Sequence, residues 1–165
     1  MIRIQTILHV TDFSETARQA LYVAHLLARD HGAKLVLMHV VRPMMAGNAS
    51  PRPPQGAPDL IEQARQRLAT EAARVADRPL EARVVSGEPG AEIVAAARPC
   101  DADLIVMGTH SQADVGRPCI GSVAEHVVRH APCAVLTLKP GAGWGLSQES
   151  EEASEPQRPA ILTGT

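Results

Sequence analysis

Short apolar runs alternate along this chain with segments whose apolar residues recur at helical spacing. Five such runs lie near residues 6–10, 35–41, 80–85, 104–107 and 134–138. An apolar run of roughly four to eight residues between polar segments is typical of a strand buried on both faces. Strict alternation of such strands with helices predicts an α/β fold, in which an open parallel sheet is covered by helices on both faces.

The segments between the strands carry the start and stop signals of helices. Ser14 is placed to cap a first helix, which Gly32 ends, and apolar residues from Leu60 to Val75 mark one face of a second. A third helix starts around Pro89 and is ended by Pro99, and a last one runs from about residue 122 to 130. Each predicted strand after the first therefore follows a helical segment.

Two segments lack any such pattern. Residues 43–58 contain five prolines and two glycines, which predicts a long surface loop inside the domain. Residues 140–165 are acidic and almost without apolar side chains after a glycine-rich start, and we expect them to be disordered. The folded domain is thus expected to span residues 1–139.

Composition narrows the classes of partner. The formal net charge is -2 and only three residues are aromatic, so neither the charge nor the stacking platforms of a nucleic-acid-binding protein are present. No run approaches the roughly 18 apolar residues that a membrane span needs. Three widely spaced cysteines favour reduced, mostly buried thiols. We therefore expect a cytoplasmic protein that binds neither nucleic acid nor membranes.

Polar and small residues gather where three predicted elements meet. Thr11 and Asp12 follow the first strand, Gly108 to Ser111 follow the fourth, and Gly121 and Ser122 open the last helix. In a parallel α/β sheet, ligands bind beyond the carboxyl ends of the strands, where the strand order reverses. Free N–H groups at a helix start suit phosphate oxygens. These residues predict an anion-binding site.

The same residues resemble a known nucleotide motif. Gly108-x-x-Ser111, nine residues and then Gly121-Ser122 are similar to the G-x-x-G-x9-G-[ST] motif of the universal stress protein family. The likeness also includes Val10 to Ala17, Leu37 to Val40 and Arg129 to Cys133, and it covers about residues 2 to 139. The resemblance implies a Rossmann-like sheet, of the adenine nucleotide alpha hydrolase-like type, in the strand order 3-2-1-4-5.

The resemblance further implies a bound adenine nucleotide, ATP before others, accompanied by Mg²⁺ or Mn²⁺ and without a redox cofactor. Adenine would lie near Val10, Thr11 and Val40, with Asp12 toward the ribose. The residues that would border the ribose and phosphates are Met107, Gly108, Thr109, His110, Ser111, Gly121, Ser122 and Val123. His9 and His39, within the strands, are expected to be packing residues, and no metal site of protein side chains alone is predicted.

Ser111 stands where the family motif has its second glycine. A serine is disfavoured there if the backbone must take a positive φ, whereas at negative φ its hydroxyl could bond a phosphate. Two functions therefore remain open: a nucleotide-binding stress or signalling protein, and a dimeric interaction module that binds no nucleotide. A phosphorylation receiver domain is disfavoured because the third strand ends in Ser86-Gly87 without an aspartate.

The resemblance also bears on assembly and activity. Members of the family often pair their fifth strands, so residues 134–138 are expected to form the interface of a homodimer. Other protein partners are not identified by the sequence. No nucleophile and base are brought together, and the chain is expected not to be an enzyme, weak or incidental ATP hydrolysis aside.

Overall fold

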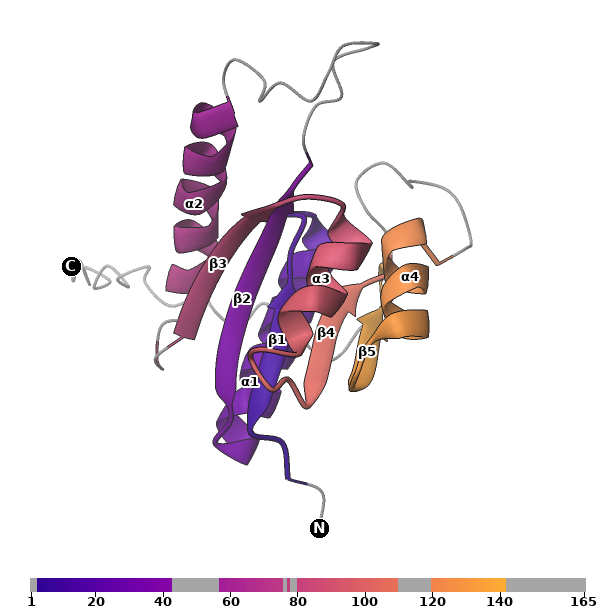
Figure 1. Cartoon of the computed structure of the whole chain (residues 1–165). Helices are drawn as coiled ribbons and strands as arrows, with labels where there is room; N and C mark the ends of the chain where they lie inside the picture. Colours follow the sequence, from indigo (N-terminus) through magenta and orange to yellow (C-terminus); the bar gives the residue numbers. More distant parts are fainter. Residues whose placement is uncertain (1–2, 43–56, 76, 78–79, 110–119, 142–165) are drawn as a thin grey trace, which may run out of the picture.

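A single parallel sheet of five strands forms the centre of the molecule (Figure 1). The computed structural model describes residues 3–42, 57–75, 77, 80–109 and 120–141. The strands are β1 (Thr6–Val10), β2 (Lys34–Val41), β3 (Leu80–Ser86), β4 (Leu104–Gly108) and β5 (Ala134–Leu138). Their order is β3-β2-β1-β4-β5, which confirms the predicted order and the predicted parallel pairing.

Within the part of the chain that the structure describes, four helices cover the two faces of the sheet (Figure 1). They are α1 (Glu15–His31), α2 (Ala57–Ala73), α3 (Pro89–Ala97) and α4 (Ser122–His130). Helices α1 and α2 pack with Ile7, Leu35 and Leu37 on one face, whereas α3 and α4 pack with Leu8 and Val36 on the other. Successive strand residues point to opposite faces, so the continuous apolar runs feed two cores.

Helix α1 begins and ends where the sequence signals place it. The Ser14 hydroxyl accepts a hydrogen bond from the backbone N–H of Ala17, and Gly32 ends the helix with a left-handed φ of 65°. A side-chain cap of this kind stabilises a helix by about 1 kcal/mol. Because α1 starts only five residues after β1 ends, this cap fixes the turn that leaves the carboxyl edge of the sheet.

Helix α2 begins earlier than its apolar pattern indicates. It starts at Ala57, so its first turn takes in the last two residues of the predicted loop 43–58, and it ends at Ala73. Proline is tolerated in the first turn of a helix because the N–H that it lacks would have no partner there. Residues 43–56 lie outside the described residues, as does the predicted tail from residue 142 onward.

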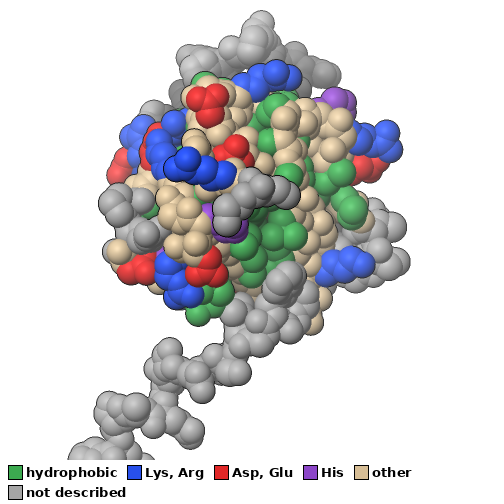
Figure 2. All heavy atoms as spheres, turned by 90° about the horizontal axis from the view of Figure 1, so that it is seen from below, with side chains coloured by type: hydrophobic (Ala, Val, Ile, Leu, Met, Phe, Trp, Pro, Cys, Tyr) green, Lys and Arg blue, Asp and Glu red, His purple; other side chains and the backbone are tan. Residues whose placement is uncertain are grey.

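The amino edge of the sheet is held by charged side chains. One carboxylate oxygen of Asp103 accepts hydrogen bonds from the backbone N–H groups of Gln5 and Thr6, which lowers the pKa of Asp103. Glu81 pairs with Arg83 and Lys34, which lower the pKa of Glu81 to about 2. Figure 2 shows the molecule from this side, with basic and acidic side chains next to one another around hydrophobic ones.

Two further expectations concern single residue types and membranes. Cys100 and Cys133 are free and half-buried, which is less burial than the sequence predicted, and Cys119 lies outside the described residues. Both thiols pack at the margin of the core under α3 and α4. Among the helices that the structure describes, none is long and apolar enough to cross a membrane.

Candidate nucleotide-binding site

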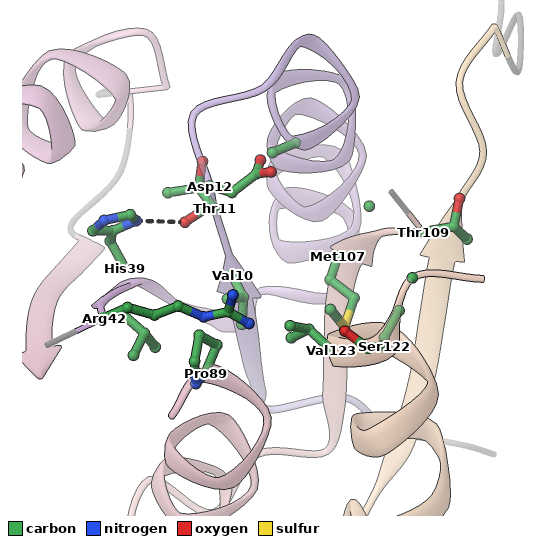
Figure 3. Close-up of a pocket in the computed structure, with 15 residues that line it drawn as sticks. Val10, Thr11, Asp12, His39, Arg42, Pro89, Met107, Thr109, Ser122 and Val123 are labelled. Atoms are coloured by element: carbon green, nitrogen blue, oxygen red, sulfur yellow. Dashed lines mark hydrogen bonds between the residues drawn. The ribbon is translucent and has the colours of Figure 1, made fainter. Parts of the chain in front are cut away.

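A pocket of about 370 Å³ lies at the carboxyl edge of the sheet (Figure 3). The ends of β1, β2 and β4 form its floor, and the starts of α3 and α4 form its walls. Its lining residues are Val10, Thr11, Asp12, Ala17, His39, Val40, Arg42, Pro89, Met107, Gly108, Thr109, Gly121, Ser122, Val123 and Ala124. The strand order reverses beside β1, which is where such sheets bind ligands.

Ten of the twelve predicted site residues line this pocket. They are Val10, Thr11, Asp12, Val40, Met107, Gly108, Thr109, Gly121, Ser122 and Val123. The other two, His110 and Ser111, lie outside the described residues. Five lining residues were not predicted, namely Ala17, His39, Arg42, Pro89 and Ala124. Arg42 and Pro89 could have been found, since each follows a strand at the carboxyl edge, as the predicted residues do.

A tight turn after β1 presents Asp12 to the pocket. The Thr11 hydroxyl accepts a hydrogen bond of 3.0 Å from the N–H of Phe13, and one Asp12 oxygen accepts one of 2.9 Å from the N–H of Ser14. Phe13 has a φ of 64°, a left-handed conformation that is rare for a bulky residue. Its buried ring belongs to the core on the α1 and α2 side, so packing holds the strained turn in place.

His39 joins the ends of β1 and β2. Its Nδ1 lies 2.8 Å from the carbonyl oxygen of Thr11, and its ring centre lies 4.3 Å from that of Phe13. Burial lowers the pKa of His39, and the nearby charge of Arg67 lowers it further. Arg67 also lies 4.1 Å above the Phe13 ring. His39 was predicted to be a packing residue, and the structure shows that it packs and lines the pocket as well.

His9, the other strand histidine, lies inside the sheet and away from the pocket lining. It is fully buried, and its Nδ1 lies 3.0 Å from the carbonyl oxygen of Val106. Its Nε2 has no hydrogen-bond partner within the part of the chain that the structure describes. The prediction of a packing residue holds for His9, but among the described residues only one of its two ring nitrogens has a partner.

The end of β4 and the start of α4 are tied together through Thr109. Its N–H and hydroxyl both donate to the carbonyl oxygen of Leu138, and its own carbonyl accepts from the N–H of Gly121 at 2.7 Å. Gly108 lies close to α1, since a Cβ added to it would come within 3.1 Å of the Thr16 methyl group. A methyl group at this point would require the Thr16 side chain to give way by a few tenths of an ångström.

The amino end of α4 lies at the pocket with backbone donors that the helix itself does not use. Gly121 is its N-cap residue, and the N–H groups of Ser122, Val123 and Ala124 have no acceptor within the helix by the geometry of a helix start. The helix dipole adds a partial positive charge at this end. Backbone donors and dipole together make an anion-binding position.

Few charges line the pocket. Of the described lining residues, only Asp12 and Arg42 carry a formal charge, because the lowered pKa keeps His39 neutral near pH 7. The guanidinium of Arg42 lies 3.4 Å from the carboxylate of Glu88. No group of three or more His, Cys, Asp or Glu side chains suited to a metal ion occurs among the described residues. The pocket therefore combines an apolar floor, one carboxylate, one cation and a helix start.

The chain is similar to known proteins along nearly the whole of its domain. The chain matches the model of the universal stress protein family over residues 3–139. It is 35% identical over 136 residues to a universal stress protein of Thermus aquaticus, which covers 82% of this chain and 98% of the relative. It is 32% identical over 139 residues to the universal stress protein MJ0531 of Methanocaldococcus jannaschii, 78% of each chain.

Solved structures show the same fold. The universal stress protein UspA from Lactobacillus plantarum superposes with a TM-score of 0.74 at 27% identity and covers 84% of this chain and 99% of its own. The universal stress protein from Archaeoglobus fulgidus, solved in complex with dAMP, gives a TM-score of 0.60 at 25% identity over 83% of this chain and 98% of its own. The match of the family model across the sheet and all four helices shows that the chain belongs to the universal stress protein family.

Proposed function

We propose that this universal stress protein binds an adenine nucleotide, ATP before others, in the pocket at the carboxyl edge of its sheet. The observation that carries the proposal is the meeting of the Asp12 turn, the end of β4 and the start of α4 around one pocket of about 370 Å³. That volume lies in the usual range for small-molecule sites. The Archaeoglobus fulgidus relative, solved in complex with dAMP, supports adenine as the base.

The chemistry of the lining suggests how such a nucleotide would lie. Val10, Val40 and Met107 offer apolar surface for the base, and the Asp12 oxygen not bonded to Ser14 would accept from a ribose hydroxyl. The phosphates would take the N–H groups at the start of α4 that have no acceptor within the helix. Mg²⁺ or Mn²⁺ would be held mainly by phosphate oxygens, because the described residues provide no cluster of ligating side chains.

The biological role that we propose is stress response or signalling through protein contacts, in the cytoplasm, without dedicated catalysis. Asp12 is the only carboxylate among the described lining residues, and one of its oxygens is already bonded to the N–H of Ser14. A general base for water would need a free acceptor aimed at the phosphates, whereas the remaining Asp12 oxygen is proposed to accept from a ribose hydroxyl. Multiple turnovers of ATP that disappear in Asp12→Ala would contradict a purely binding role.

Homodimerisation through β5 is part of the proposal. β5 lies at one end of the strand order and pairs with β4 on one side, and no other described strand pairs with its second edge, where a strand from a second chain could add. Sizing with light scattering at micromolar concentration is expected to give twice the mass of one chain. A monomer under those conditions would contradict this part of the proposal.

The nucleotide proposal is tested by calorimetric titration of ATP with Mg²⁺ into the purified protein, with GTP and CTP in parallel. Saturable heat for ATP at one site per chain is expected. The alternative is an interaction module that binds no nucleotide, which the replacement of the second motif glycine by Ser111 favours. Absence of binding to all three nucleotides would support that module instead.

A further inference from the structure

Arg42 occupies a position in the pocket that the motif does not explain. It follows directly after β2, and its side chain lines the pocket. Figure 3 shows the side chain extended across the pocket from β2 toward Val10 and Pro89. Its guanidinium lies 3.4 Å from Glu88, the N-cap residue of α3. The only cation among the described lining residues thus lies over the apolar floor.

The sheet order places Arg42 away from the phosphate position. β2 and β4 lie on opposite sides of β1, and α4 starts on the β4 side of the pocket (Figure 3). A nucleotide whose phosphates bind at the start of α4 must therefore extend its base toward β2. Arg42 would then meet the base, while Val10 and Val40 contact the opposite face of the ring.

We infer, on the basis of the proposed function, that Arg42 stacks its guanidinium on the exposed face of the bound base and so sets the preference for a purine. A guanidinium is planar, delocalised and weakly hydrated, and it stacks readily on aromatic rings and nucleobases. The larger ring of a purine offers more stacking surface than a pyrimidine. Arg42 is then a specificity residue of the base half of the pocket.

Glu88 competes only weakly with the base for the Arg42 guanidinium. The two side chains are 59% and 71% exposed, and an ion pair so exposed to water is weak. Binding of a base can therefore draw the guanidinium away from Glu88 at little cost. Removing the carboxylate should leave Arg42 free to stack and should tighten binding slightly.

Affinities for adenosine and for ATP separate stacking from phosphate binding. Arg42→Ala is expected to weaken both ligands by the same factor, about tenfold, as loss of a partly desolvated cation–π contact would. Arg42→Lys keeps the charge but lacks the plane, and it should recover only part of the loss. Glu88→Gln should tighten both ligands by about twofold. Arg29→Ala, an exposed arginine paired with Asp30 on α1, is the matched control and should change neither.

The results that would contradict the role of Arg42 can be told apart from those that would contradict the proposed function. Loss of ATP affinity with unchanged adenosine affinity in Arg42→Ala would make Arg42 a phosphate ligand and would overturn the inference. Full recovery in Arg42→Lys would show that charge alone matters, which also overturns it. A wild-type protein that binds both ligands, with Arg42→Ala unaffected, contradicts only the role of Arg42. A wild-type protein that binds neither contradicts the proposed function itself, and the role of Arg42 with it.

Discussion

The Nδ1 of His39 lies 2.8 Å from the carbonyl oxygen of Thr11 and so ties the end of β2 to the turn that carries Asp12. A carbonyl only accepts, so this nitrogen carries the proton. His39→Phe keeps a ring beside Phe13 but leaves the Thr11 carbonyl without its donor. We expect a loss of about 1–2 kcal/mol in the free energy of unfolding, measured with urea. A His39→Phe variant as stable as the wild type would contradict a structural role for this bond.

The buried His9 is expected to make the fold less stable in acid. Burial lowers its pKa from 6.5 to about 4, against a raising effect of its bond to Val106. In the unfolded chain His9 takes up its proton near pH 6.5, and in the folded chain only near pH 4. The stability that neutral, buried His9 contributes to the fold is therefore fully present above pH 6.5. It is lost as the pH falls from 6.5 toward 4, by about 2 kcal/mol at pH 5.

A comparison of the wild type with His9→Asn separates the contribution of His9 to the pH dependence of stability from that of the carboxylates. Urea unfolding of the wild type and of His9→Asn is measured at pH 7.5 and at pH 5. The wild type is expected to lose more stability than the variant over this interval, because asparagine does not titrate. Equal losses in the two proteins would show that His9 is protonated as easily in the folded state as in the unfolded one.

The close approach of Gly108 to Thr16 predicts that a destabilising change at one of these residues can be compensated by a change at the other. In Gly108→Ala, the new methyl group would lie 3.1 Å from the Thr16 methyl group, which is closer than an ordinary contact. We expect a loss of about 1 kcal/mol in the free energy of unfolding. Thr16→Ser removes the opposing methyl group, so the double variant should recover most of the loss relative to Thr16→Ser alone. Additive losses would place the strain elsewhere.

Substitutions of Asp12 distinguish its role in the turn from its proposed contact with the ribose. Asp12→Asn retains an oxygen for the N–H of Ser14, so the fold should keep its stability within about 0.5 kcal/mol. It replaces the second carboxylate oxygen by a donor, so ATP affinity should fall about tenfold. Asp12→Ala should lose both stability and affinity. Undiminished ATP binding in Asp12→Asn would remove Asp12 from the ribose site.

Much of this fold is predictable because its signals are local. Ser14 and Gly32 mark the ends of α1 by cap chemistry, and the apolar runs mark strands to within about one residue. The start of α2 lies earlier than predicted, because the proline-rich pattern assigns Pro58 to the loop although the first turn of a helix accepts proline. The sheet order came from the family resemblance, since the pairing of distant strands leaves no local mark.

The site was predictable only in part for a similar reason. Residues in the motif, such as Gly108 and Gly121, were found because their spacing is characteristic, and they line the pocket. His39 was missed because nothing in its immediate sequence shows that it lies beside the Asp12 turn, whereas the place of Arg42 directly after a strand could have pointed to it. The left-handed backbone of Phe13 was equally hidden, since packing against His39 and Arg67 rather than a glycine sustains it.

Gly121→Asp tests the central claim most directly. Aspartate is a good N-cap residue beside the positive end of a helix, so the variant should be as stable as the wild type, whereas its charge would repel phosphates at the start of α4. Gly121→Asn, equally suited to the cap but uncharged, is the control. In calorimetric titrations with ATP and Mg²⁺, we predict saturable binding to the wild type and to Gly121→Asn, and none to a folded Gly121→Asp. No binding to the wild type, or equal binding to all three proteins, would contradict a nucleotide held at this helix.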